Sequence, residues 1–425
     1  MANYIRPRGT LDIYEKQAAI FQKIENACKK IARNYHYKMI QTPTFESTAL
    51  FARSSGEGSD IVSKEMYSFK DKGEREISLR PEGTAGAIRA IIENKLYATI
   101  DLPLKYYYLG SFFRYERPQA GRYREFSQFG VEIVGTNSYL DDVEAIVFAT
   151  KVLKELNLND YVVKINSFGN STCRSHYRDI LKDYFSQFAN DLCEDCQKRL
   201  QVNPLRILDC KIDKEFFLSK DIPTAISALD ESSKNDFIEV QKLLESENIP
   251  FVIDHKLVRG LDYYTGLIFE IDIQTKDQKV YTIGGGGHYS NLVKELGGPD
   301  LSCVGFGLGV NRLALILEER FGSDAFDEKA DIYVMSLSST CTLKAFQIAN
   351  HMRDLGYRVV MENQKKSVSS MFKYASKHQF AYAFILGEDE LNKEAINIKN
   401  LKTQTQHTIA IKDVDVFMKE ALQND

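Results

Sequence analysis

The sequence predicts a large α+β domain built on an antiparallel sheet, followed by a small α/β domain. Strand-like segments rich in aromatic and β-branched residues fill two blocks of the N-terminal part. A charged stretch with helical patterning separates these blocks, and strands alternate with helices beyond Ala330. We therefore expect a first domain at residues 1–325, with a helical insertion at about 169–250, and a second domain at residues 326–425.

The first domain is expected to open with a helix and continue into strands. Apolar residues recur at helical spacing from Leu11 to about Tyr35, and again from Asp141 to Leu156. The second of these helices is expected to pack against the sheet. Period-two patterning and bounding turn residues predict strands at Ile77–Leu79, Leu104–Leu109, Phe126–Ile133, Val258–Ile273 and Val280–Ile283.

The second domain is expected to alternate strands with helices. This order is typical of a small α/β domain, because consecutive parallel strands need a crossover connection. The expected elements are strand Ile332–Leu337, helix Thr342–Leu355, strand Arg358–Met361, helix Val368–Lys377 and strand Tyr382–Leu386.

Composition narrows the possible function classes. The chain has 425 residues, is 44% hydrophobic and carries a formal net charge of -4, so it shows no overall signature of nucleic-acid binding. Any such binding must use local patches. The polar, basic start Met1–Arg8 lacks a signal-peptide core, and no apolar stretch reaches the roughly 20 residues that cross a bilayer. We expect a soluble, cytoplasmic protein that has no membrane partner.

The seven cysteines do not suggest a disulfide framework, because their number is odd and they are scattered over a long chain. Only Cys193 and Cys196, in a C-x-x-C pair, and the later Cys210 suggest a metal site. A structural zinc site needs four ligands, and the sequence offers no second close cysteine pair. We therefore expect no zinc site, and the sequence does not identify the residues that would bind any other metal ion.

The densest cluster of candidate functional residues lies in a basic hairpin between two predicted strands, from Phe113 to Phe126. The planar guanidinium of Arg114 suits phosphate oxygens, and Glu116, two residues along, faces the same side of a strand. A carboxylate there can accept a hydrogen bond from an adenine amino group. The alternative is a solvated charged hairpin without a ligand.

Several separated blocks together resemble the histidyl branch of the class II aminoacyl-tRNA synthetases. The run from Tyr108 to Glu132 resembles motif 2 of that family, and Gly305-x-Gly-x-Gly-x-x-Arg312 resembles motif 3. A phosphate-binding G-x-x-x-x-G-K-[ST] loop is absent from the sequence, so arginines and metal ions must hold phosphates. Three further matching blocks are Pro7–Thr10 with Asp12, Leu79–Thr84 and Leu257–Gly266.

The resemblance implies a class II catalytic domain, a C-terminal anticodon-binding domain and three substrates: histidine, ATP and tRNA(His). ATP would be a substrate accompanied by Mg²⁺. In the family's pattern, Arg114 and Arg259 would be catalytic and bind the α-phosphate, Arg312 would bind the γ-phosphate, and Glu116 would read adenine. The segment around Pro43 resembles the family's dimer interface, which implies a homodimer.

The resemblance also implies a histidine pocket. Glu82, Thr84 and Gln128 would hold the ammonium and carboxylate ends of the amino acid. A carboxylate and phenols suit an imidazole ring, which has one N–H donor and one acceptor. Glu132, Tyr263 and Tyr264 would surround that ring, beside Arg259. The alternative for the two tyrosines is ordinary packing in a core.

Three positions depart from the family's usual residues. His288 and Ser290 stand where an arginine and an aspartate are usual, and Asn311 stands where a glutamate is usual. Two alternatives to a synthetase follow. One is a regulatory, histidine-binding relative without catalysis, as in ATP phosphoribosyltransferase, and the other is a specialised duplicate of the synthetase.

Overall fold

The computed structural model describes residues 4–55, 61–213, 221–260, 263–327, 329–364 and 366–423. The chain forms two compact units, Met1–Phe326 and Asp327–Asp425. Leu261 and Asp262, inside one of the motif blocks, lie outside the described residues. Within the described ranges, no helix has the length and apolar character needed to span a bilayer.

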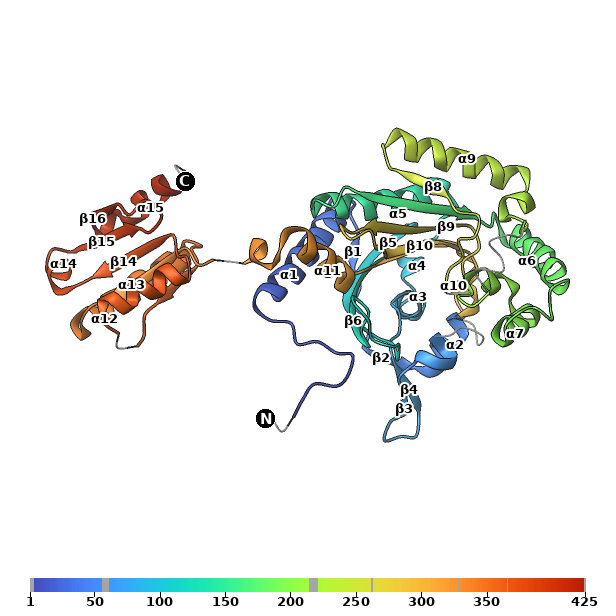
Figure 1. Ribbon diagram of the computed structural model, residues 1–425, viewed down its shortest axis with the longest axis horizontal. Coiled ribbons are helices and arrows are strands. Elements are labelled where there is room, and N and C mark those ends of the chain that lie inside the picture. The colour runs from blue at the N-terminus through green and yellow to red at the C-terminus, as the bar shows by residue number, and fades with distance from the viewer. Residues whose placement is uncertain are drawn as a thin grey trace. The chain divides into compact units, whose positions relative to one another are not determined.

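The first unit is organised around an eight-stranded sheet (Figure 1). Neighbouring strands are antiparallel, except that β1 and β8 pair in parallel with β5 and β7 at the two edges. In order across the sheet the strands are β1 (Lys38–Met39), β5 (Leu104–Phe113), β6 (Glu125–Val134), β11 (Cys303–Gly309), β10 (Val280–Tyr289), β9 (Leu267–Gln274), β7 (Tyr161–Ser167) and β8 (Phe251–Ile253).

One face of this sheet forms the main apolar core. Side chains alternate between the faces of a strand, so Phe129, Val131 and Ile133 of β6 share a face with Phe306 of β11. All four are buried, and they belong to one core cluster with residues of α1 (Glu15–Asn34), α5 (Tyr139–Glu155) and α11 (Val310–Phe321). The opposite face is left for other contacts.

Further elements of the first unit surround the sheet. A small sheet pairs β2 and β3 with the central strand β4. These elements and the remaining short helices are β2 (Phe45–Ser47), α2 (Thr48–Ser55), η1 (Ile61–Glu65), β3 (Ser68–Lys70), β4 (Glu76–Leu79), α3 (Thr84–Glu93), α4 (Leu96–Thr99), α10 (Leu292–Glu295) and η4 (Ser323–Phe326).

A helical insertion connects β7 to β8. Most of its helices pack their apolar side chains into a second core cluster, which also contains Tyr263, Tyr264 and Tyr289, whereas its last helix, Glu231–Ser246, packs into the main core. The insertion therefore contacts residues on the face of the sheet opposite the main core. Its described elements are α6 (Ser171–Ser186), α7 (Glu194–Val202), η2 (Pro204–Asp209), η3 (Ala225–Ala228) and α9 (Glu231–Ser246).

The second unit is a mixed five-stranded sheet with helices. β12 pairs in parallel with β13 and β14, whereas β14, β15 and β16 pair antiparallel. Its elements are β12 (Ile332–Ser336), η5 (Ser339–Cys341), α12 (Thr342–Asp354), β13 (Val359–Met361), α13 (Val368–Lys377), β14 (Tyr382–Leu386), α14 (Glu388–Asn392), β15 (Ala395–Asn400), β16 (Gln406–Ala410), η6 (Ile411–Asp413) and α15 (Val414–Gln423).

The structure confirms the predicted fold class and corrects the bounds of several elements. The predicted strand Leu104–Leu109 continues to Phe113, and the opening helix begins at Glu15 instead of Leu11. The predicted strand Val258–Ile273 begins only at Leu267, because Gly260 and Gly266 belong to a connection that carries Arg259 to the sheet. The predicted strand Val280–Ile283 continues to Tyr289, because its glycines pair with both neighbouring strands.

Candidate active site

Glycines form the floor of the candidate site on the open face of the large sheet. A Cβ atom at Gly307 would lie 1.8 Å from Gln128 Nε2, and one at Gly305 would lie 2.2 Å from Glu132 Oε2. A Cβ atom at Gly285 would lie 2.8 Å from Arg259 Nη1. Three polar side chains therefore lie flat against backbone that has no side chain of its own, which only glycine permits.

Glu132 is the buried centre of this face. It is 1% exposed, and its Oε1 accepts hydrogen bonds from Thr84 Oγ1 at 2.7 Å and from Tyr108 OH at 3.1 Å. Its Oε2 accepts one from Tyr289 OH at 2.5 Å. Burial raises the pKa of Glu132 to about 8, although the hydroxyl donors oppose that shift. The carboxyl can therefore gain or lose a proton near neutral pH.

Glu82 lies beside this centre and binds the start of α3. Its Oε2 accepts from the backbone N–H of Thr84 at 2.6 Å, and its Oε1 accepts from that of Ala85 at 2.9 Å. Burial raises the pKa of Glu82, while these hydrogen bonds and the charge of Arg114 oppose the shift. Glu82 therefore fixes the helix terminus and leaves further lone pairs for a ligand.

Tyr263 and Tyr264 line the same region. Both are buried, their ring centroids are 4.7 Å apart, and the ring of Tyr263 lies 5.2 Å from that of Tyr289. Burial raises the pKa of both phenols, and the charges of Glu82 and Glu132 act on both. Both rings belong to a core cluster and also border the carboxylates, so packing explains their burial, and their place in a histidine pocket stays a prediction.

Three arginines reach this face from different parts of the chain. Arg259 Nη1 donates to Glu270 Oε1 at 2.6 Å, and the charge of Glu270 also acts on Arg312. Glu116 in turn lies 3.9 Å from Arg114 Nη1 and its charge acts on Arg312. The two carboxylates therefore link the three guanidinium groups into one charged region.

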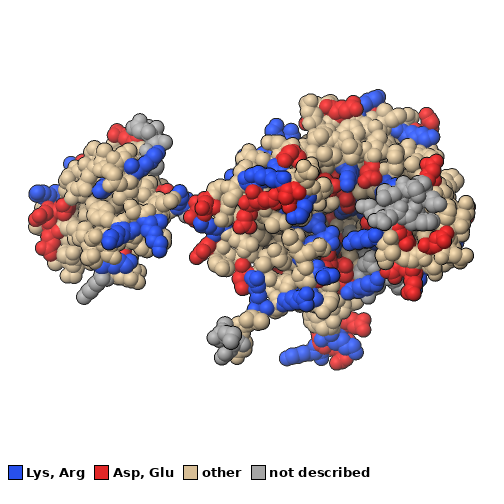
Figure 2. Space-filling view, viewed as in Figure 1, with Lys and Arg blue, Asp and Glu red and all other residues tan. Residues whose placement is uncertain are grey.

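The basic hairpin folds against the same region. Arg122 Nη1 lies 3.4 Å from Glu116 Oε2, and the guanidinium of Arg124 lies 3.7 Å above the ring of Tyr115. Burial lowers the pKa of Arg312, and the positive charge of the neighbouring Arg122 lowers it further. The guanidinium groups of Arg122 and Arg312 therefore lie in the same charged region. Figure 2 shows basic and acidic side chains together around the hollow of the larger unit.

The three departures from the family's pattern have structural roles. His288 Nδ1 lies 2.9 Å from Asp142 Oδ1 of α5, on the side of the sheet away from Glu132. Ser290 Oγ accepts from Thr265 Oγ1 at 3.1 Å, and Asn311 Oδ1 accepts from the Ser127 N–H at 2.7 Å. Asn311 thus fixes α11 to β6 and leaves no buried amide group of Ser127 unpaired.

The structure adds three residues that sequence patterns did not single out. Tyr108 and Tyr289 hydrogen-bond Glu132, and Glu270 pairs with Arg259. A signal for Glu270 was present, since it alternates with apolar residues in β9 and points to the polar face. The tyrosines gave no signal of their own, because buried tyrosines are common.

Two protein-family models match this chain. The family model described as histidyl-tRNA synthetase matches residues 9–171 and 215–313. The chain belongs to the histidyl-tRNA synthetase family. A second model, the anticodon binding domain, matches residues 331–421, which lie in the second compact unit.

Individual members of the histidyl-tRNA synthetase family match over nearly the whole chain. A histidine–tRNA ligase of Thermosipho melanesiensis is 44% identical and covers 95% of each chain. One from Clostridioides difficile is 42% identical and covers 98% of this chain and 99% of its own. The crystal structure of apo S. aureus histidyl-tRNA synthetase matches with a TM-score of 0.83 at 33% identity, over 97% of this chain and 99% of that one.

The raised pKa of Glu132 predicts a specific pH dependence of stability. Below the unfolded-state pKa of about 4.5 the carboxyl is protonated in both states. Between that value and about 8 the unfolded state loses the proton first, so this carboxyl's contribution to folding stability falls as pH rises. In Glu132→Gln this contribution is absent.

The test is denaturant unfolding of both proteins from pH 5 to 8. The unfolding free energy of the unmodified protein should fall relative to that of Glu132→Gln, by at most about 1.4 kcal/mol per pH unit. A difference between the two proteins that does not change with pH would show that Glu132 ionises normally.

Proposed function

We propose that this chain is a histidine–tRNA ligase, which activates histidine with ATP and transfers the histidyl group to tRNA(His). The observation that carries the proposal is the open sheet face, where a buried carboxyl and three arginines occupy one region. Family membership and the relatives' names support the same activity. Histidine, ATP and the tRNA are its proposed substrates.

The first step would form histidyl-adenylate. A carboxylate oxygen of histidine attacks the α-phosphorus of ATP, the bond to the bridging oxygen breaks, and pyrophosphate leaves with the electron pair. Arg114 and Arg259 are proposed to bind the α-phosphate, where negative charge builds, and Arg312 to bind the γ-phosphate. Fixed guanidinium groups stabilise that charge without having to reorganise.

Arg259 has a free hydrogen-bond donor for this role. Its Nε is buried and has no acceptor among the residues that the structure describes. A buried unpaired donor costs about 1–3 kcal/mol, which an incoming phosphate oxygen would recover. Glu270 holds the other side of the guanidinium, so Arg259 is fixed in place before the substrate arrives.

The adenine and the metal would occupy the same charged region. Glu116 is proposed to accept from the adenine amino group, with Arg114 and Arg122 beside it. Mg²⁺ is proposed to accompany ATP and to offset charge on the leaving phosphates. The partly exposed carboxylate of Glu270, whose charge acts on Arg259 and Arg312, offers the oxygen ligands that Mg²⁺ takes.

The histidine substrate is proposed to lie against the buried carboxylates. Glu82, Thr84 and Gln128 would hold its ammonium and carboxylate ends, and Glu132, Tyr263 and Tyr264 would enclose its ring, beside Arg259. The imidazole N–H can donate to Glu132, whose pKa of about 8 lets it share a proton near neutral pH. An apolar side chain in this pocket would leave buried polar groups unpaired, which disfavours it.

The regulatory alternative is disfavoured by what this chain retains. A structure titled ATP phosphoribosyltransferase regulatory subunit/histidyl-tRNA synthetase, from Bacillus halodurans, shares the fold at 20% identity and a TM-score of 0.65. Our chain keeps Arg259 over the sheet and has the second unit that matches the anticodon-binding model. A binding protein that only senses histidine needs no cation for the α-phosphate of ATP and no anticodon-binding unit.

We also propose a homodimer and binding of the tRNA anticodon by the second unit. Exposed apolar side chains on β1, β2 and β3 support a contact with a second copy, which sedimentation velocity would detect as twice the chain's mass. Their exposed fractions are 56% for Met39, 55% for Phe45 and 48% for Phe69.

Replacing Arg259 by alanine tests the adenylation chemistry. The unmodified protein should exchange pyrophosphate into ATP only when histidine is present. Arg259→Ala should lower this exchange at least about a hundredfold, because it removes a charge made for the transition state. Arg75→Ala, in an exposed hairpin where Arg75 pairs with Asp71, serves as the control and should exchange normally.

Histidine-dependent exchange that persists in Arg259→Ala would remove that residue from the catalytic step. Histidine binding by the unmodified protein without any exchange would favour the regulatory alternative.

Charge reversal on α13 tests the proposed division of labour between the two units. Lys373 and Lys377 are exposed on this helix, and their double change to glutamate should lower the rate of tRNA charging about tenfold by repelling phosphates. Pyrophosphate exchange should not change. The matched control is Lys402→Glu in the exposed turn between β15 and β16, and equal losses in both assays would contradict the division.

A further inference from the structure

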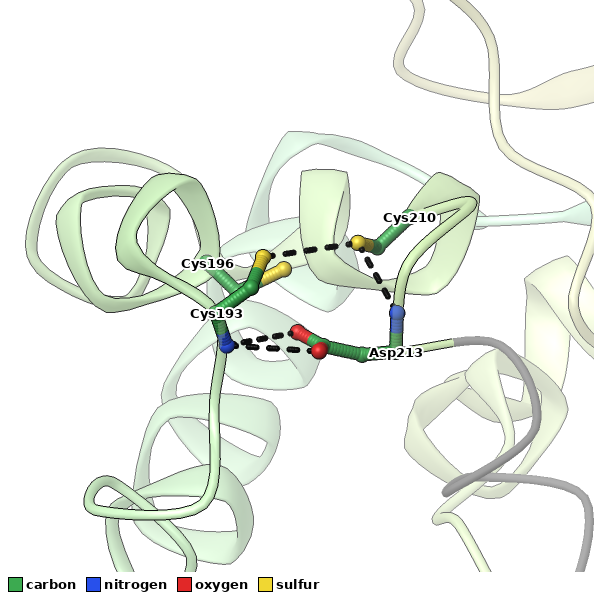
Figure 3. A group of neighbouring side chains, drawn as sticks. All are labelled: Cys193, Cys196, Cys210 and Asp213. Atoms are coloured by element: carbon green, nitrogen blue, oxygen red, sulfur yellow. Dashed lines mark hydrogen bonds between the residues drawn. The ribbon is translucent and has the colours of Figure 1, made fainter.

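Four side chains in the helical insertion point toward a common centre (Figure 3). They are Cys193, Cys196, Cys210 and Asp213, and one ligand atom of each lies within 4.8 Å of the others. Cys196, Cys210 and Asp213 are buried, and Cys193 is partly exposed. Sequence patterns found the three cysteines but missed the aspartate, because only a second cysteine pair was sought.

The spacing of these atoms fits a tetrahedral metal ion. Zinc lies about 2.3 Å from cysteine sulfur, so two sulfurs of a regular tetrahedron are about 3.8 Å apart. Cys193 Sγ and Cys210 Sγ are 3.8 Å apart. A disulfide would require about 2.05 Å, and all seven cysteines are free thiols in the structure.

The local backbone supports this arrangement. Cys193 is the N-cap of α7, so Cys196 lies on that helix's first turn. Cys210 directly follows η2, and its sulfur accepts from the backbone N–H of Asp213 at 3.3 Å. The Asp213 carboxylate accepts from the Cys193 N–H at 3.2 and 3.1 Å, which orients it toward the sulfurs. Such hydrogen bonds around the ligands are typical of metal sites.

We propose that Cys193, Cys196, Cys210 and Asp213 bind one structural zinc ion. Three thiolates and one carboxylate complete a tetrahedron without an open position for water, so the site is structural and not catalytic. This reverses our expectation from sequence that the chain has no zinc site. The four ligands lie between the two ranges that the family model matches, residues 9–171 and 215–313.

The zinc would fix the wall of the insertion that faces Arg259. The ion would join the start of α7 to the end of η2, and Arg206 within η2 donates from Nη2 to the Gly260 backbone oxygen at 2.6 Å. Leu205 and Arg206 line a small cavity together with Arg259 and Tyr264. A fixed η2 therefore limits the movement of the connection that carries Arg259.

Metal analysis of the full-length chain tests this proposal. The protein is purified under reducing conditions with zinc in the growth medium, and its zinc is measured by mass spectrometry after gel filtration. We expect about one zinc per chain. Cys196→Ser, Cys210→Ser and Asp213→Ala should each retain at least about tenfold less. Cys173→Ser is the matched control, because Cys173 is a buried cysteine of the same insertion that lies outside the cluster.

Cobalt gives a second readout that needs no variant to fold. Co²⁺ added to the zinc-stripped, unmodified protein should produce the absorption of tetrahedral thiolate coordination, and zinc should displace it. The proposal is overturned if the reduced protein neither retains zinc nor gives this spectrum, or if zinc content is unchanged in all three ligand variants. A Cys193–Cys210 disulfide in protein purified without reductant, together with no zinc, would also overturn it.

Discussion

The arrangement of the site depends on how the large sheet divides its two faces. Phe129, Val131 and Ile133 of β6 bury one face in the main core, so the alternating residues Gln128, Gly130 and Glu132 must point to the other. A buried carboxyl group tolerates loss of water only with hydrogen-bond partners, and three hydroxyl groups provide them for Glu132. A shift of register by one residue would exchange the two faces and remove the site.

The polar face of the sheet has room for functional side chains because the strands beneath them carry glycines, which have no side chain. Gly285, Gly305 and Gly307 lie on neighbouring strands, and the side chains of Arg259, Glu132 and Gln128 occupy the space that Cβ atoms would take. These side chains come from segments far apart in the sequence. Their positions relative to one another are therefore set by strand pairing, and a loop alone could not hold them so firmly.

Much of this organisation could be predicted from sequence, and the failures have physical reasons. Long elements with strong periodicity were placed well, such as β6 and α13, because side-chain period reports directly on burial. The strand after Val258 was placed too early, since apolar residues in a connection resemble a strand. The partner of Arg259, Glu270, and the fourth zinc ligand, Asp213, were missed because pairing across distant segments leaves no local pattern.

The central claim is that Arg114, Arg259 and Arg312 bind a single ATP molecule whose α-phosphate lies next to the histidine held by Glu132. A crystal structure with ATP and histidinol, which has no carboxylate to react, tests it most directly. We predict both Arg114 and Arg259 within hydrogen-bonding distance of the α-phosphate, Arg312 on the γ-phosphate and the imidazole against Glu132. A triphosphate that contacts only one of the three arginines, or an imidazole bound away from Glu132, would contradict the account.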